Sequence, residues 1–225
     1  MTANGLEAGF LARIGEADRQ AVLGVGRRRP MASGAVLFRE GDDAYEVLIV
    51  LSGIVKIWVA SASGRVVILD VLDPGSVMGE MSVVDGGARS ASASALEDGE
   101  LFVVPATRLR SLLETHPGIT IELLRVVTER LRGASRRQLE FSAGDALGHL
   151  CRAIVQLADR YAQEADGVRE VLLPMAQGDV GAWGGLSREA VVKGLKALRR
   201  LGWVEGEGRR LRLLDEAALL DRAQA

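Results

Sequence analysis

Cysteine and histidine are scarce in this chain of 225 residues. Cys151 is the single cysteine, which excludes intrachain disulfides and all-cysteine metal or iron–sulfur sites, since these need several thiolates from one chain. The histidines, His116 and His149, lie far apart, and no spacing suggests a metal site or a nucleophile with its base. We therefore expect a protein that is not an enzyme and that holds no metal and no cofactor.

Long apolar runs and an excess of basic charge are also missing. No run approaches the length of a membrane-spanning helix, and the first ten residues lack the basic-then-apolar order of a secretion signal. We expect a soluble, cytoplasmic protein without membrane contact. The net charge of −2 carries no general basic signature, so any contact with nucleic acid must come from a local patch.

Glycine-punctuated apolar runs fill residues 34 to 105. Examples are "YEVLIVL", "IVKIWVA" and "VVILDVL", with turn signals such as "LSG", "SASG" and "DPG" between them. Short valine- and isoleucine-rich runs with regular turns predict an antiparallel β roll or barrel. Residues 5 to 29, before the roll, look helical and mildly amphipathic.

From Thr107 onward, leucine, arginine and glutamate recur at helical spacing. A helix ends at the "HPG" turn, and the next is predicted from about Gly118 to Phe141, roughly 36 Å at 1.5 Å per residue. A hinge near "SAGDALG" follows, and then a helix over residues 145–163 and a compact section over residues 175–221. The sequence thus predicts an α+β protein with a roll domain (1–117), a long helix with a hinge (118–144) and a C-terminal domain (145–225).

The long helix carries a seam at three- and four-residue intervals. Its members are Ile121, Leu124, Thr128, Leu131, Ser135 and Gln138. Such spacing is typical of a two-stranded helical contact, and we infer a parallel homodimer. The alternative is a helix packed on its own roll, which explains the side formed by Leu123, Val126 and Val127.

The stretch "WGGLSREAVVKGLKALRRLGWVEGEGRRLRLL" has the layout of a winged helix-turn-helix. Ser187 is a good N-cap, and Val191, Leu195 and Leu198 form one apolar face. Arg188, Glu189 and Lys193 are left pointing away. Arginine can bind guanine and glutamate can accept from cytosine, which suits G·C-containing half-sites.

The rest of the stretch predicts the wing. "WVEGEGRRLRLL" reads as a two-stranded hairpin whose Arg209, Arg210 and Arg212 would lie near phosphates. The alternative for the helix is an amphipathic surface helix with a solvated charged face.

A second stretch, "VMGEMSVVDGGARSASA", places an acid and a base around a glycine-rich loop. Arg89 would neutralise a phosphate, the backbone amides near Ser90 would complete its hydrogen bonds, and Glu80 would accept from a hydroxyl. The alternative is a salt bridge from Glu80 to Arg89 across an ordinary hairpin, with the glycines serving only the turn.

Both stretches resemble one family. "GEMSVVDGGARSASA" resembles the phosphate-binding cassette of cyclic-nucleotide-binding domains, and "LSREAVVKGLKAL" resembles the recognition helix of the Crp-Fnr family of bacterial transcription regulators. The resemblance covers roughly residues 6 to 215. It implies a jelly-roll-like cyclic-nucleotide-binding domain, a long dimerisation helix and a winged helix-turn-helix.

The resemblance also implies roles for residues. Glu80 would bind the ribose 2′-hydroxyl and Arg89 the cyclic phosphate, while Gly79, Met81, Ser82 and Ser90 would shape the cassette. Ser135 would contact the base, but Ala134 stands beside it where the catabolite activator of the family has adjacent polar side chains. The resemblance implies cyclic AMP as the effector. The departure at Ala134 makes the adenine-reading contact weaker or different, which leaves cyclic GMP as the alternative.

For DNA, the implied residues are Ser187, Arg188, Glu189 and Lys193, with Asp145 opening the helix after the hinge. Ala176 stands where the family often has a threonine cap, and the glycines around Trp183 predict a weak first helix of the DNA-binding unit unless Trp183 compensates by packing.

The predicted function is a cyclic-nucleotide-responsive, homodimeric transcription regulator. Its predicted partners are double-stranded DNA, a cyclic nucleotide, a second copy of the chain and RNA polymerase. One alternative is an orphan regulator of the same fold that binds DNA without a nucleotide. Another is a nucleotide-binding module that regulates a protein partner through the "SREAVVKGLKAL" helix.

Overall fold

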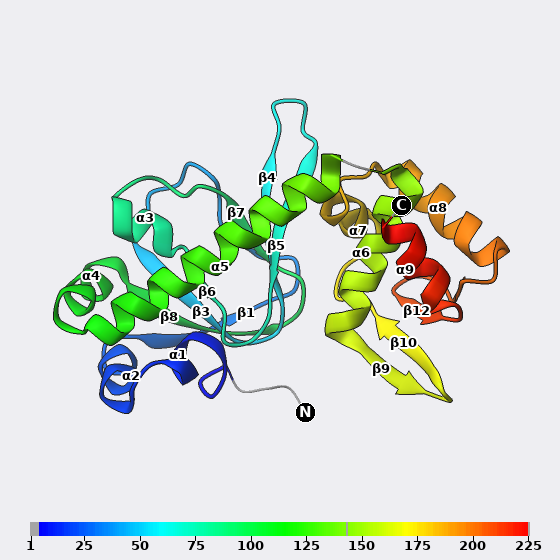
Figure 1. Ribbon diagram of the computed structural model, residues 1–225. Coiled ribbons are helices and arrows are strands. Elements are labelled where there is room, and N and C mark those ends of the chain that lie inside the picture. Colours follow the sequence, from blue (N-terminus) through cyan, green and yellow to red (C-terminus); the bar gives the residue numbers. More distant parts are fainter. Residues whose placement is uncertain (1–4, 143, 225) are drawn as a thin grey trace. The chain divides into compact units, whose positions relative to one another are not determined.

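The computed structural model describes residues 5–142 and 144–224 (Figure 1). The chain divides into two compact units. Unit 1 consists of Met1–Ser61 and Leu69–Gly133, and unit 2 consists of Ala62–Ile68 and Ala134–Ala225. The predicted α+β class is confirmed, because antiparallel sheets, a long helix and a C-terminal helical region follow one another along the chain.

Two four-stranded sheets form the roll, which belongs to unit 1 except for residues 66–68 of β5. In spatial order, the first contains β1 (Arg27–Met31), β8 (Gly99–Pro105), β3 (Glu46–Ser52) and β6 (Val77–Met78). The second contains β2 (Val36–Phe38), β7 (Ser92–Ala95), β4 (Val55–Ala60) and β5 (Val66–Leu72). Pairing is antiparallel from β1 through β8 and β3 to β6, and from β2 through β7 to β4.

Strand β3 is apolar on both faces because it separates two hydrophobic clusters. Successive strand side chains point to opposite faces of a sheet. Leu48 and Val50 therefore pack in the cluster that fills the roll, whereas Val47, Ile49 and Leu51 pack in the cluster beneath the helices. The same alternation holds in β8. A run of five buried residues in "EVLIVLS" is thus a central strand covered on both sides.

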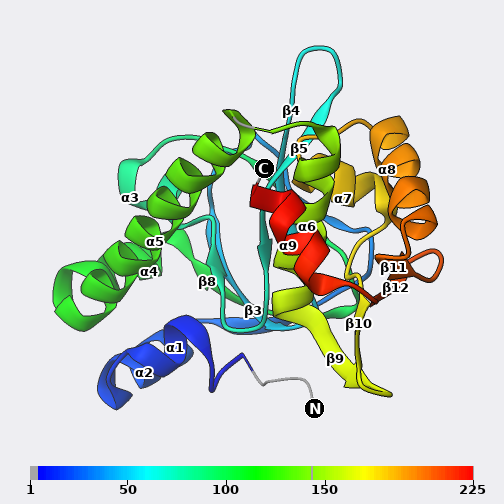
Figure 2. The ribbon, with the colours of Figure 1, turned by 45° about the vertical axis from the view of Figure 1, so that its right-hand side comes forward.

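The helices of unit 1 cover the outer face of the first sheet. They are α1 (Gly9–Arg13), α2 (Glu16–Leu23), α4 (Ala106–Thr115) and the first turns of α5 (Pro117–Ser142), while α3 (Glu80–Asp85) lies within the cassette (Figures 1 and 2). Leu11, Leu109, Ile119 and Leu123 are among the buried residues that join these helices to the sheet. The outer cluster therefore holds α5 against the roll.

The expected helical segment over residues 5–29 is wrong at its end. Helix α2 stops at Leu23, and β1 begins at Arg27. Gly26 marks the change, because a Cβ there would lie 2.2 Å from the Phe102 ring. The arginine-rich strand has no alternating apolar pattern, and its pairing with β8 comes from backbone hydrogen bonds.

Unit 2 contains three helices of the predicted C-terminal domain and a further one at its end. They are α6 (Ala146–Tyr161), α7 (Gln177–Trp183), α8 (Arg188–Arg200) and α9 (Glu216–Gln224) (Figure 1). A sheet in the order β11, β12, β10, β9 completes the unit, with strands Val204–Glu205, Arg210–Leu213, Val168–Leu172 and Ala162–Ala165 respectively. The wing predicted in "WVEGEGRRLRLL" is the antiparallel pair β11–β12.

Strands β9 and β10 and helix α9 of unit 2 were not predicted. Strand β9, "AQEA", has no strongly apolar residue, and its backbone pairing with β10 forms the edge of the sheet. Helix α9 extends past the section predicted over residues 175–221, and it buries only Leu219 and Ala223.

Among the described residues, no helix is both long and apolar enough to cross a membrane.

Cys151 is fully buried in α6. Burial is the largest cause that raises the pKa of its thiol to about 11. The reactive thiolate is therefore rare at pH 8. We expect native protein to leave Ellman's reagent unreduced at pH 8, and denatured protein to react with one thiol per chain. A rapid native reaction would contradict this packing.

Candidate nucleotide cassette and DNA-reading helix

A left-handed glycine opens the cassette. Strand β6 pairs with β3 through Met78, and the chain then turns at Gly79 into α3. Gly79 has φ +78°, and a Cβ there would lie 2.2 Å from Nη1 of Arg89. Both the backbone conformation and the approach of the guanidinium require glycine at this position.

Arg89 is a buried guanidinium with its own set of acceptors. Its Nη1 donates to the Gly79 carbonyl at 2.8 Å, its Nη2 donates to the Glu46 carbonyl at 2.5 Å, and its exposure is 4%. The group also stacks over the Phe38 ring at 4.4 Å from the centroid. Burial lowers the pKa of Arg89, while nearby carboxylates, Glu46 foremost, raise it.

Glu80 is the buried acid of the cassette and pairs with a residue of the long helix. It is 1% exposed, and its Oε1 accepts from Nη1 of Arg130 at 2.5 Å. Arg130 also donates to the Val77 carbonyl. Because both contacts lie on β6 and the start of α3, Arg130 ties α5 to the cassette.

Sequence reasoning missed Arg130. A signal for it exists, because Leu123 is buried against the roll and Arg130 follows it by seven residues, on the same helical face. The predicted roll-facing side is accurate for Leu123 and Val126, which join the outer cluster.

Two polar atoms of the cassette are buried without a hydrogen-bond partner among the described residues. They are Nε of Arg89, a donor, and Oε2 of Glu80, an acceptor. Buried polar atoms are normally paired, so each such atom calls for an explanation. The groups that would satisfy these two atoms are an anionic acceptor for Nε of Arg89 and a hydroxyl donor for Oε2 of Glu80.

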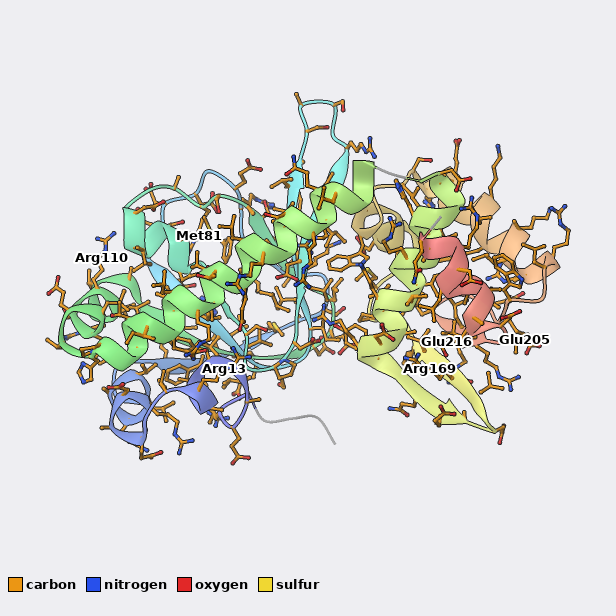
Figure 3. All side chains as sticks on the ribbon, in the orientation of Figure 1. Arg13, Met81, Arg110, Arg169, Glu205 and Glu216 are labelled. Carbon is orange, nitrogen blue, oxygen red and sulfur yellow. The ribbon has the colours of Figure 1, made fainter. Side chains whose placement is uncertain are left out.

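The remaining predicted cassette residues have separate positions. Ser82 is buried, and its Oγ donates to the Ala88 carbonyl at 3.0 Å, which holds the glycine-rich loop. Met81 is 46% exposed on α3, where Figure 3 shows it, and Ser90 is exposed after the loop. Ser135 is an exposed residue of α5 that belongs to unit 2.

The alternative of an ordinary hairpin with a Glu80–Arg89 salt bridge differs from the structure. Residues 80–85 form helix α3, Glu80 pairs with Arg130, and the two terminal nitrogens of Arg89 donate to carbonyls. Arg110, labelled in Figure 3, donates from Nε to the Val83 carbonyl at 2.8 Å and holds this helix from α4. Gly79 and Gly86 end α3 on either side with left-handed φ values.

The predicted recognition helix is α8. Ser187 caps it, its Oγ accepting from the Ala190 amide at 3.1 Å. The apolar face is buried at Val191, Leu195 and Leu198. On the other side the structure exposes the predicted DNA-reading residues Ser187, Arg188, Glu189 and Lys193.

Close packing explains two of the glycines around this helix. A Cβ at Gly181 in α7 would lie 2.9 Å from Cγ2 of Val191, and a Cβ at Gly194 in α8 would lie 2.4 Å from Cδ2 of Leu150. Trp183 is 7% exposed, so it packs as expected, and Ala176 makes no side-chain cap to α7. Packing against α8 thus stabilises a helix with weak intrinsic propensity.

The three arginines of the wing already have partners within the chain. Nε of Arg209 donates to the Leu173 carbonyl at 2.6 Å. Arg210 pairs with Glu170 at 3.3 Å, and Arg212 pairs with Glu205 at 3.0 Å. These contacts shape the hairpin, and their expected placement near phosphates stays a prediction. Among the described residues, no cluster of His, Cys, Asp or Glu could hold a metal ion.

Two family models match the chain. Residues 28–116 match the cyclic nucleotide-binding domain, and residues 148–222 match the Crp-like helix-turn-helix domain. The first match includes the cassette, and the second includes α7 and α8.

Relatives match most of the chain. The CRP-like cAMP-activated global transcriptional regulator of Mycobacterium tuberculosis is 30% identical over 191 residues, which cover 85% of each chain. The transcriptional activator protein FnrA of Stutzerimonas stutzeri is 27% identical over 195 residues, which cover 87% of this chain and 80% of the relative.

Solved structures share the fold. FixK2 from Bradyrhizobium japonicum has a TM-score of 0.77 and 23% identity, with coverage of 89% of this chain and 98% of that one. The c-di-GMP responsive global regulator CLP of Xanthomonas campestris has a TM-score of 0.81 and 22% identity, with coverage of 89% and 100%.

The buried Glu80–Arg130 pair should contribute to the free energy of unfolding. We expect Arg130→Met to lower the free energy of unfolding by about 2 kcal/mol, because it leaves a buried carboxylate unpaired. The loss is smaller than for a fully buried pair because Arg130 is 29% exposed. Urea unfolding of the full chain measures this loss, and adding Glu80→Gln to Arg130→Met should recover part of it.

Arg132→Met is the matched control, since Arg132 is an exposed residue of the same helix. Equal losses for Arg130→Met and Arg132→Met would show that the pair contributes nothing specific.

Proposed function

Because the chain belongs to the Crp-Fnr family of DNA-binding transcription regulators, we propose that it is a homodimeric regulator whose operator affinity is controlled by a cyclic nucleotide. This family comprises regulators and not enzymes. The effector we propose is cyclic AMP, and its binding site is the cassette around Glu80 and Arg89.

The observation that carries the proposal is the pair of unpartnered atoms in the cassette. A cyclic nucleotide offers an anionic phosphate, which accepts hydrogen bonds, and a ribose 2′-hydroxyl, which donates one. The phosphate complements Nε of Arg89, and the hydroxyl complements Oε2 of Glu80. Charge-assisted bonds of this kind in a buried site are stronger than bonds between neutral groups.

Adenine is the proposed base of the nucleotide. The Mycobacterium tuberculosis relative is named as cAMP-activated, which favours cyclic AMP here. Ser135 is proposed to contact the base, and Ala134 beside it offers no polar atom on its side chain. Cyclic GMP is the alternative ligand.

A second copy of the chain is the proposed partner of α5. Ile121, Leu124 and Leu131 are 59%, 65% and 66% exposed in the single chain, at the spacing of a two-stranded seam. Large apolar side chains gathered on one helix face favour an interface. A parallel dimer would cover them and extend through the exposed Ser135 and Gln138.

The proposed switch starts at Glu80. A nucleotide hydroxyl on Oε2 of Glu80 would act on the carboxylate that also holds Arg130 of α5. A ligand shifts a conformational equilibrium only through contacts that differ between the states, and we propose the Glu80–Arg130 contact as the one that differs.

The proposed DNA contact is α8 in the major groove. Arg188 and Glu189 in its first turn, with Lys193 one turn later, would read base edges. Two copies in a dimer would reach successive major grooves about 34 Å apart. The cytoplasm is the proposed location, since the proposed target is bacterial DNA, and RNA polymerase is a further proposed partner.

Calorimetric titration with cyclic AMP and cyclic GMP tests the ligand. We expect the intact protein to bind cyclic AMP more tightly and Arg89→Lys to lose about 100-fold in affinity, because a point charge replaces a planar guanidinium. Arg108→Lys is the control, since Arg108 is an exposed arginine of α4. If the folded protein binds neither nucleotide, the orphan-regulator alternative becomes the better description.

Measurement of operator binding at several salt concentrations tests whether α8 contacts DNA. We expect Arg188→Ala to weaken specific binding about 10- to 100-fold, as loss of a bidentate base contact does. Arg200→Ala, an exposed change at the other end of the helix, should alter specificity little. Unchanged DNA binding in Arg188→Ala would favour the alternative in which this helix docks a protein partner.

A further inference from the structure

The two carboxylate oxygens of Asp145 accept hydrogen bonds from two different helices. Oδ1 accepts from the Leu147 amide at 3.0 Å and the Gly148 amide at 2.9 Å, which caps α6. Oδ2 accepts from Nη2 of Arg222, in α9, at 2.5 Å. The pKa of Asp145 is lowered, with the Gly148 amide as the largest cause and Arg222 contributing.

Helix α9 is fixed in place at both of its ends. At its start, Glu216 pairs with Arg169 of β10, and Figure 3 labels both residues. At its end, Arg152 of α6 donates to the Ala223 carbonyl. Leu219 between them is fully buried. Arg222 is therefore presented to Asp145 from an anchored helix.

The backbone of α9 also lies close to the first turn of α6. A Cβ at Gly148 would lie 3.1 Å from the carbonyl oxygen of Arg222 and 3.2 Å from its Nη1. Gly148 is buried, and its amide is one of the two that Asp145 caps. Arg222 therefore contacts the first turn of α6 in two ways. Its guanidinium pairs with the Asp145 carboxylate, and its carbonyl oxygen lies close to the backbone of Gly148.

We infer that α9 is a clamp on the first turn of α6 and that Arg222 is a positioning residue for the DNA-binding unit. Asp145 lies where the chain that leaves α5 enters α6, so a change transmitted along the chain reaches α6, and the helices packed on it, through this turn. If the first turn of α6 is held by α9, a movement of the preceding chain is passed on to the rest of α6. If this turn is frayed, the turn itself changes conformation and the rest of α6 stays where it is. The coupling of nucleotide to operator through this turn rests on the proposed function, but the clamp does not.

Amide hydrogen exchange of the ligand-free full chain tests the clamp directly. We expect Arg222→Ala to speed exchange at Leu147 and Gly148 about 3-fold, a modest change because the Asp145 side chain is 63% exposed and the pair is screened by solvent. Exchange at Ile154, in the middle of α6, should not change. Asp221→Ala on an exposed position of α9 is the matched control.

Two further variants separate positioning from general destabilisation. Arg222→Lys keeps the positive charge and should restore part of the protection. Asp145→Asn keeps a good cap but loses the ion pair, so adding Arg222→Ala to it should cause little further change. Unchanged exchange in Arg222→Ala would overturn the proposal that α9 clamps α6. Fully additive effects of Arg222→Ala and Asp145→Asn would overturn it as well.

The ratio of operator affinity with and without cyclic AMP tests the consequence. We expect this ratio to fall about 3-fold in Arg222→Ala while nucleotide affinity is unchanged, and an unchanged ratio would overturn the role of the clamp in coupling. If the intact protein shows no nucleotide effect on DNA, the proposed function fails, and the exchange result still decides the clamp.

Discussion

The burial of Arg89 is the constraint on which the cassette depends. A guanidinium that loses its water must find acceptors within the fold, and those available are the carbonyls of Gly79 and Glu46 and the face of Phe38. The first carbonyl comes from a left-handed turn that only glycine accommodates at this distance. That turn starts α3, and α3 places Glu80 in the interior. The geometry of the whole cassette therefore follows from where one cation is buried.

The roll was predictable because its strands carry strong local signals. Runs such as "EVLIVL" are apolar and β-branched, and glycines with positive φ, such as Gly53, follow them. Strand β1 was not predictable in this way, because its arginines contribute no alternating pattern and its partner β8 lies about seventy residues further along the chain. Pairing between distant backbone segments leaves little trace in a short window of sequence.

The candidate site was predictable in its residue types and less so in its contacts. The acid and the base of the cassette could be named, but their partners could not. Glu80 pairs with Arg130, fifty positions away on another element, and Arg89 donates to backbone carbonyls, which no side-chain pattern reveals. In the second unit, the cap at Ser187 and the buried face of α8 were local and therefore predictable. The partners of Asp145 in α9 were not.

The position of β3 between two clusters has a consequence for how the roll denatures. Leu48 belongs to the interior of the roll, and Val47 and Ile49 beside it belong to the packing under the helices. Neither cluster can lose this strand without exposing the apolar surface of the other. The two clusters are therefore expected to melt together in a single cooperative transition, and proteases should find few cleavable intermediates in which the strands persist without the helices.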